Sequence, residues 1–175
     1  MLKAKAISNI DTLGDSGEDS CGCAPALIHA TRQEDFELVK LLVDNGANVN
    51  GEDYAKTTPL SIAAVDSNAE MVEYLLKKGA RANGTHLRGT PLIYAMLERG
   101  KGKDVPRIVQ LLITAGVDPN LKYNGDPIIN AAVRSGRADA ILTLVSNGAN
   151  PNARSVRSDG YPYVPLQQAA MLRNP

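Results

Sequence analysis

The sequence is poor in aromatic residues and has no long apolar run. Of its 175 residues, 4% are aromatic, with one phenylalanine and no tryptophan. A core without large rings has to be built from aliphatic side chains and alanine, which favours helices. No apolar run approaches the roughly 18 residues of a membrane span, and polar residues interrupt every apolar stretch of residues 1–13. The sequence therefore predicts neither a membrane helix nor a secretory signal.

Cysteine and histidine are equally scarce, with two of each at Cys21, Cys23, His29 and His86. Two cysteines in a chain of this length exclude a disulfide scaffold and suit a reducing compartment. The four side chains match the ligand number of zinc, but His86 lies far from the others and the usual second close pair is missing. We expect unliganded thiols, with no metal site and no cofactor.

Motifs of catalysis are also missing. Residues 84–89 have the glycine spacing of a phosphate loop, but Thr90 stands where lysine is required. No Gly-x-Ser-x-Gly elbow occurs, and two isolated histidines are a poor start for a hydrolytic triad. The sequence predicts that this chain is not an enzyme.

Neither sign of charge is in excess, because 19 basic residues balance 19 acidic ones. The balance hides a polarity: residues 1–80 carry 13 acids and 7 bases, a net charge of −6, and residues 81–175 carry +6. In an elongated fold this polarity would orient a partner. The basic residues of the second half are dispersed rather than clustered, so we do not expect a nucleic-acid partner.

A short phrase ending in asparagine occurs four times, each time after an amphipathic run. It covers residues 46–50, 79–83, 116–120 and 148–152. The preceding apolar residues fall on one stripe of a helix, and the glycine stands where a helix ends in the left-handed conformation. A second phrase, Thr-Pro-Leu at 58–60 and 90–92, has the cap and first-turn proline of a helix start.

The two phrases keep a constant register. The interval from Pro25 to Gly46 recurs without change from Thr58 to Gly79 and from Pro127 to Gly148. Such a register means that each unit holds two helices of fixed length. Helices are predicted over 25–32, 35–44, 59–66, 69–78, 91–99, 105–114, 128–135, 138–146 and 165–173.

These phrases resemble the ankyrin repeat, a family with a period of about 33 residues, and the interval from Pro25 to Thr58 equals that period. The resemblance implies an all-α solenoid of stacked helix-turn-helix units with projecting hairpin fingers. It covers residues 25–175, with repeats near 25–57, 58–89, 90–126 and 127–163 and a partial fifth at 164–175. Residues 1–24 are interpreted as a cap or linker, because Leu2, Ala6 and Ile10 have the spacing of a short capping helix and residues 15–22 are rich in Gly, Asp and Ser.

One departure from the family concerns a buried hydrogen bond. Family members usually place a histidine after Thr-Pro-Leu, where its ring bonds the capping threonine. The equivalent positions here are Ile28, Ser61, Ile93, Asn130 and Gln167. The ring bond is therefore expected to be missing in every unit.

Aromatic side chains recur at a fixed distance before the units. Four residues before the capping positions stand Tyr54, His86 and Tyr123, and three before Val164 stands Tyr161. In an ankyrin-like stack these positions lie at finger tips about one repeat (~10 Å) apart. Exposed tyrosine is typical of recognition surfaces; the alternative is that each ring packs on its neighbouring finger. The candidate partner-binding residues are Tyr54, His86, Arg88, Lys122, Tyr123, Arg134, Arg157, Tyr161 and Tyr163.

The favoured function is that of a non-catalytic adaptor or scaffold, which recognises a protein partner through finger tips and a concave groove of first helices. Basic side chains beside these finger-tip residues favour a partner with an acidic surface. The second hypothesis is the target-recognition portion of a larger enzyme or a bacterial or viral effector. The fifth unit stops after one helix, which predicts self-association through its uncovered apolar side. The expected location is cytoplasmic, and secretion into a host cell stays open.

Overall fold

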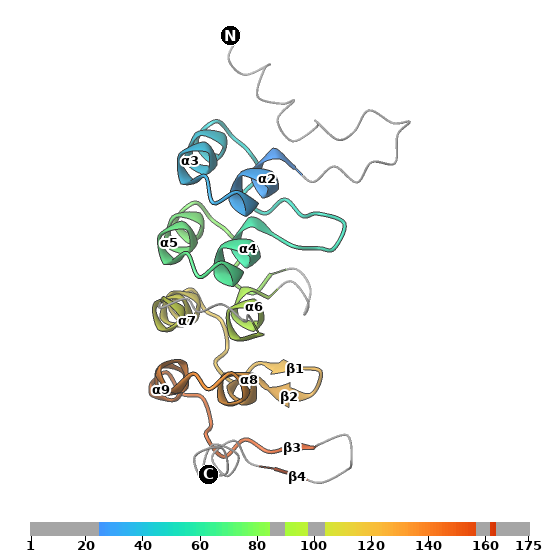
Figure 1. The fold of residues 1–175 in the computed structure, drawn as a ribbon, viewed down its shortest axis with the longest axis vertical. Helices are drawn as coiled ribbons and strands as arrows, with labels where there is room; N and C mark the ends of the chain where they lie inside the picture. The colour runs from blue at the N-terminus through green and yellow to red at the C-terminus, as the bar shows by residue number, and fades with distance from the viewer. Residues whose placement is uncertain (1–24, 85–89, 98–103, 157–161, 164–175) are drawn as a thin grey trace.

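Four antiparallel helix pairs are stacked along one axis (Figure 1). The structure, a computed structural model, describes residues 25–84, 90–97, 104–156 and 162–163. The helices of this part are α2 (Ala26–Arg32), α3 (Phe36–Asp44), α4 (Pro59–Val65), α5 (Ala69–Lys77), α6 (Pro91–Leu97), α7 (Val105–Thr114), α8 (Ile128–Arg134) and α9 (Ala138–Ser146). Two short antiparallel hairpins, β1 (Lys122–Tyr123) with β2 (Asp126–Pro127) and β3 (Ser155–Val156) with β4 (Pro162–Tyr163), project beside the first helices.

Local chemistry sets where these helices begin and end. The Thr58 hydroxyl accepts a hydrogen bond from the Ser61 amide, and the Asn68 side chain accepts one from Met71, so both helices start on a side-chain cap. At the other end, the four phrase glycines have φ between 90° and 95°. An L-residue with a Cβ is strained there, so glycine ends each second helix.

The core lies between the two layers of helices. Small side chains dominate the inner row of first helices, where Ala30, Ala63, Ala95 and Ala132 are all buried. Larger aliphatic side chains fill the outer row of second helices, where Val39, Leu75, Leu112 and Leu144 are buried. Each buried leucine contributes roughly 1.5–3 kcal/mol, and the alanines let neighbouring first helices approach closely.

The predicted helix bounds are confirmed to within one residue wherever the structure describes both ends. The predicted end of the helix at Arg99, the helix over 165–173 and the amino-terminal capping helix lie outside the described residues. The prediction of an all-α architecture with hairpin fingers is confirmed.

Polar side chains take over the histidine slot in two units. Thr58 Oγ1 and Ser61 Oγ lie 2.9 Å apart, so a serine makes the bond to the capping threonine that a histidine ring would make. In the fourth unit the fully buried Asn130 donates from Nδ2 to Asp126, one residue before the proline that replaces the threonine. The ring is missing, as expected, but in these two units a hydrogen bond still ties the helix start to its cap or finger.

Candidate binding face

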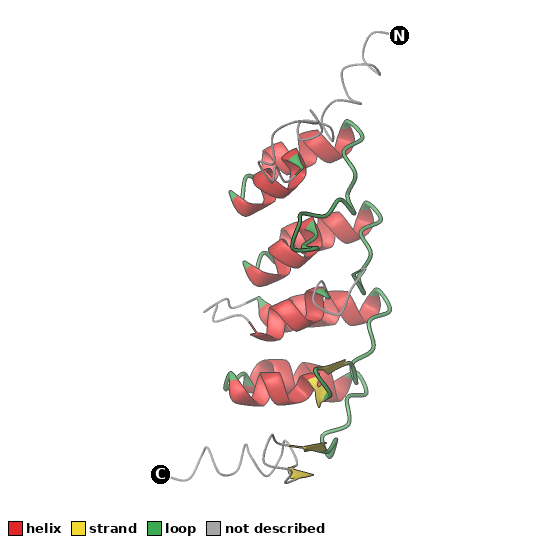
Figure 2. Ribbon diagram, turned by 90° about the vertical axis from the view of Figure 1, so that its right-hand side faces the viewer, coloured by secondary structure: helices red, strands yellow, loops and turns green. Residues whose placement is uncertain are grey.

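Fingers and first helices share one side of the stack, and the second helices form the other. Figure 2 views the finger side, where successive loops and hairpins lie above one another along the axis. Four of the predicted binding residues, Tyr54, Lys122, Tyr123 and Arg134, come from this side of the units.

Tyr54 stands at the tip of the finger formed by residues 45–58, and its side chain is 77% exposed. The tip is a tight turn, since Lys56 N donates to Asp53 O (2.9 Å) and Lys56 itself has a positive φ of 62°. Asp53 fixes the turn from inside: its carboxylate accepts from the Thr57 amide at 2.8 Å. An exposed ring is thus presented on a turn whose backbone is held in place.

Arg32 reaches this finger from the last turn of α2. Its guanidinium donates to the Asp53 carboxylate at 2.5 Å, where the Asp53 side chain is only 7% exposed and the Arg32 side chain about half exposed. The ion pair joins the first helix of one unit to the finger that leads into the next. It also places a cation on the finger that presents Tyr54, although Arg32 was not among the residues predicted from the sequence.

The finger of Tyr123 is built differently from the finger of Tyr54, although each tyrosine stands four residues before the capping position of the next helix. Its finger closes in a two-residue turn, Asn124 and Gly125, both with positive φ (52° and 80°), and Tyr123 pairs with Asp126 across the hairpin. Asn-Gly is the preferred sequence for such a turn. The Tyr123 ring is half buried and packs against the core, whereas its neighbour Lys122 is exposed.

Arg134 ends α8 at the position that Arg32 occupies in α2, at the same count after the proline that opens its unit. Its guanidinium pairs with Asp126 at 2.5 Å. Between these arginines in the stack, Val65 occupies the same position at the end of α4 and is half buried. The carboxyl-terminal ends of the first helices therefore carry two anchored arginines and an apolar residue. The equal spacing from the two prolines is the sequence signal that could have identified Arg32.

The remaining predicted residues cannot be placed in this face by their side chains. Tyr163 lies in β4 and pairs with Ser155 through its backbone. His86, Arg88, Arg157 and Tyr161 lie outside the described residues, as do Cys21 and Cys23.

The phrase asparagines join one unit to the next at the base of the fingers. Asn50 donates to Gly79 O (3.1 Å) and accepts from Arg81 N (2.8 Å), and Asn120 makes the equivalent bonds to Gly148 O (3.0 Å) and Asn150 N (2.8 Å). Both side chains reach the phrase of the following unit, so they fix the spacing between neighbouring units.

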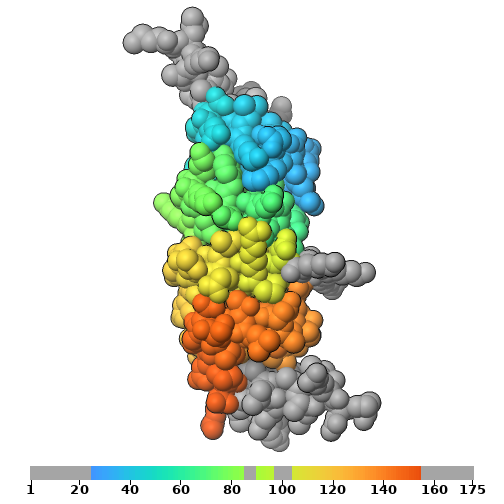
Figure 3. Space-filling view, turned by 90° about the vertical axis from the view of Figure 1, so that its left-hand side faces the viewer, coloured from blue at the N-terminus to red at the C-terminus, as the bar shows by residue number. Residues whose placement is uncertain are grey.

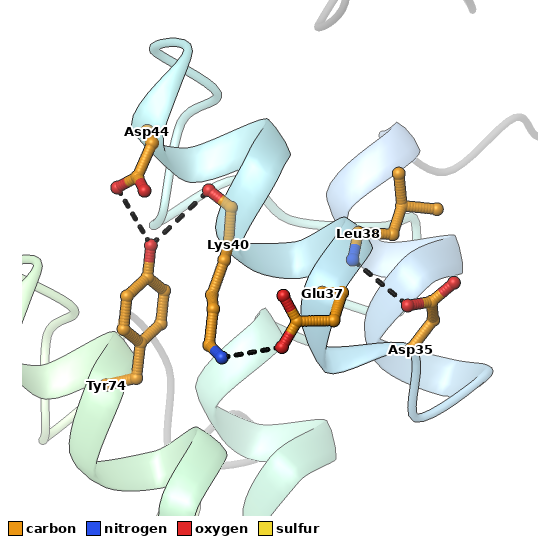
Figure 4. A network of polar contacts seen from close by, with 6 residues as sticks. All are labelled: Asp35, Glu37, Leu38, Lys40, Asp44 and Tyr74. Atoms are coloured by element: carbon orange, nitrogen blue, oxygen red, sulfur yellow. Dashed lines mark hydrogen bonds and ion pairs between the residues drawn. The ribbon is translucent and has the colours of Figure 1, made fainter.

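The opposite face is lined by the outer helices α3, α5, α7 and α9 (Figure 3). Polar contacts tie each helix to the next. Tyr74 of α5 donates to Asp44 of α3 at 3.0 Å (Figure 4), and Glu73 of α5 pairs with Arg107 of α7 at 2.7 Å. Gln110 of α7 exchanges hydrogen bonds with Asn147, the residue that follows α9. These contacts are satisfied within the stack, which makes the outer face a structural seam.

The same contacts shift the pKa values of the side chains that make them. Hydrogen bonds from Lys78 and Tyr74 lower the pKa of Asp44, and bonds from Lys77 and Arg107 lower the pKa of Glu73. Partial burial and the Asp44 carboxylate raise the pKa of Tyr74, and the hydrogen bond to Asp44 raises the pKa of Lys78. Each shift favours the protonation state that makes the contact.

Metal-ligating side chains are dispersed in the described part of the chain. Within residues 25–84, 90–97, 104–156 and 162–163 there is no group of three or more His, Cys, Asp and Glu side chains that could hold a metal ion. His29, on α2, is exposed. No helix in the described part of the chain is long and apolar enough to cross a bilayer.

The stack of two-helix units with finger hairpins defines a repeat solenoid. A family model described as Ankyrin repeats (3 copies) matches residues 8–86, and the chain carries ankyrin repeats in an all-α ankyrin solenoid. Ankyrin repeats are protein–protein interaction modules and are generally non-catalytic.

Curated relatives carry the same repeats. The chain is 34% identical over 117 residues to "Ankyrin repeat, SAM and basic leucine zipper domain-containing protein 1" of Dasypus novemcinctus, an alignment that covers 66% of this chain and 24% of that protein. The protein of the same name from Mus musculus is 42% identical over 86 residues, which is 49% of this chain and 18% of the relative. The chain thus spans a quarter or less of the length of these relatives.

Proposed function

We propose that this chain is a non-catalytic adaptor that binds a protein partner through its finger tips and the concave side of its first helices. The observation that carries the proposal is Tyr54, a large ring with 77% of its surface exposed on a turn fixed by a buried carboxylate. A rigid tyrosine loses little conformational entropy when it becomes buried at an interface. Arg32 is held on the same finger, and arginine and tyrosine are enriched among the residues that dominate binding energy.

The charges on this face support a partner with an acidic surface. Arg32 and Arg134 are held near the fingers by Asp53 and Asp126, and Lys122 is exposed on the third finger. The anchored arginines keep a fixed position, so a partner carboxylate would meet a preorganised donor. The association rate should accordingly fall as the salt concentration rises.

The test starts from a partner identified by affinity capture and mass spectrometry, whose affinity is then measured with purified chains. Tyr54→Ala should weaken binding by about thirtyfold, the equivalent of roughly 2 kcal/mol. The matched control is Leu142→Ala on the outer helix α9, which also removes an exposed large apolar side chain and should leave the affinity unchanged.

The outcomes separate the two parts of the proposed face. If Tyr54→Ala leaves the affinity unchanged while Val65→Asp abolishes binding, the groove alone carries recognition. If Leu142→Ala weakens binding and neither finger nor groove variant does, the outer face is the interface and the proposal is wrong.

The second candidate function is target recognition within a larger protein, of which these repeats form a portion. Relatives whose printed name combines ankyrin repeats with SAM and basic leucine zipper domains favour it, because the matched segment is 24% or less of their length. An enzyme or effector activity elsewhere in the parent protein would support this candidate. Sequencing of the parent gene tests it directly.

Two narrower proposals concern the state of the chain. We propose an intracellular location, since two cysteines suit a reducing compartment, and fractionation of cells expressing the tagged chain tests it.

Self-association through residues 164–175, which lie outside the described residues, would appear in light scattering as a mass that rises with concentration. A monomer at all concentrations would exclude it.

A further inference from the structure

The outer helix α3 leaves two leucines uncovered. Leu38 is 36% exposed and Leu41 is 60% exposed. In the later units, counted back from the phrase glycine, the position of Leu38 is occupied by Met71, Ile108 and Ala140, all of them buried. The position of Leu41 is occupied by Tyr74, Leu111 and Thr143, all of them half buried.

Contacts of Tyr74 show what lies against this side of a second helix. Its ring packs edge-on to Phe36 with the ring centroids 5.6 Å apart, and its hydroxyl bonds Asp44, so it faces the outer helix of the preceding unit. In Figure 4 the Leu38 side chain points away from Tyr74. Leu38 and Leu41 therefore lie on the side of α3 that, in the later units, packs against the preceding unit.

The sequence before α2 fits such a preceding unit. The interval from Gly14 to Pro25 equals the intervals from Gly79 to Thr90 and from Gly116 to Pro127, and it is one residue shorter than the interval from Gly46 to Thr58. Counted back from Gly14, Ile7 takes the position of Val39, Val72 and Val109, which are fully buried, and of Ile141, which is half buried. Ile10 takes the position of Leu75, Leu112 and Leu144, which are fully buried, and of Leu42, which is half buried. The family match also begins at residue 8, ahead of α2.

We propose that residues 4–14 cover Leu38 and Leu41 as the second helix of an upstream ankyrin repeat. The interpretation of residues 1–24 as a cap or linker stays a prediction, and this proposal assigns the first part of that segment to a repeat. The chain entering α2 already lies beside the base of the Tyr54 finger, because a Cβ added to Gly51 would come within 3.6 Å of Pro25 Cγ.

The experiment compares two substitutions to the same residue in the full chain. Ile10→Asp places a charge at a position that is buried in the later units, and should lower the melting temperature by about 5 °C or more. Thr12→Asp is the control, because its position is exposed in all four described units (Asp44, Lys77, Thr114 and Ser146); it should shift the melting temperature by less than about 2 °C.

Amide hydrogen exchange tests the same contact from the other side and does not depend on melting behaviour. In the unaltered chain, amides of residues 6–13 should exchange at least about a hundredfold more slowly than in a free peptide, and Leu41→Asp should abolish that protection. Free-peptide rates in the unaltered chain would overturn the proposal, and so would equal melting temperatures for the Ile10→Asp and Thr12→Asp variants.

Discussion

The fingers that carry Tyr54 and Tyr123 place the same residue at the same count and give it opposite roles. Tyr54 follows a buried aspartate that fixes the turn from inside, so its ring stands in solvent. Tyr123 precedes an Asn-Gly turn that brings two strands into register, and its ring packs on the core. The difference teaches that the turn type, and not the distance from the helix, decides whether a finger residue is available to a partner.

The largest effect is expected at the carboxylate of Asp126, in the finger formed by β1 and β2. Asp126→Ala removes the acceptor for Asn130 and Arg134 and leaves the Asn130 amide fully buried with its bond lost, at a cost of about 2–3 kcal/mol. Urea denaturation measures the loss. Lys122→Ala in the same hairpin is the control and should stay within about 0.5 kcal/mol. Equal stabilities would show that the third finger does not depend on this anchor.

The tyrosines themselves give the next largest difference. Tyr123→Ala should lower the free energy of unfolding by about 1–2 kcal/mol, because the half-buried ring loses its contacts with the core. Tyr54→Ala should change it by no more than about 0.5 kcal/mol, since the ring makes little contact. Thermal denaturation of the two variants side by side gives the comparison. A loss at Tyr54 as large as that at Tyr123 would make both rings structural.

The bases of the two fingers should respond alike, because each is held by the same asparagine bonds. Asn50→Ala and Asn120→Ala should each cost about 1 kcal/mol, as each removes one donated and one accepted hydrogen bond to the next unit. Asn50→Asp, which keeps the acceptor, should cost less than Asn50→Ala. A loss at one asparagine only would show that the units are not joined equivalently.

The smallest effect is expected from acid on the outer face, far from both fingers. The pKa of Asp44 is lowered in the folded state, so its contribution is present above the unfolded value of about 4 and is lost as the pH falls through the folded-state pKa. The melting temperature of the unaltered chain should therefore fall more steeply below pH 4 than that of Asp44→Asn. Parallel acid profiles for the two chains would contradict this.

Sequence reasoning placed the helices well because each helix carries its own signals. The cap at Thr58, the proline after it and the glycine at position 79 are short-range features with one dominant geometry each. The exposure of the finger tyrosines was less predictable. Tyr54 and Tyr123 are alike in spacing, and only the turns of their fingers distinguish them.

Contacts between units were the least accessible to prediction. The bond from Asn50 to Gly79 and the ion pair from Arg32 to Asp53 each join groups that lie far apart in the sequence. The sequence around either group does not predict which distant group it contacts. The repeat period supplies the spacing of such pairs but not the direction in which each side chain points.

The sequence by itself determined the period, the helix bounds and the ankyrin architecture, since apolar spacing, caps and terminal glycines act within a few residues of one another. Only the tertiary structure decided which ring is exposed, which arginines are anchored and which leucines of α3 are exposed. These properties arise where side chains from different units meet, and their exposure and pairing depend on the stacked arrangement rather than on any one segment.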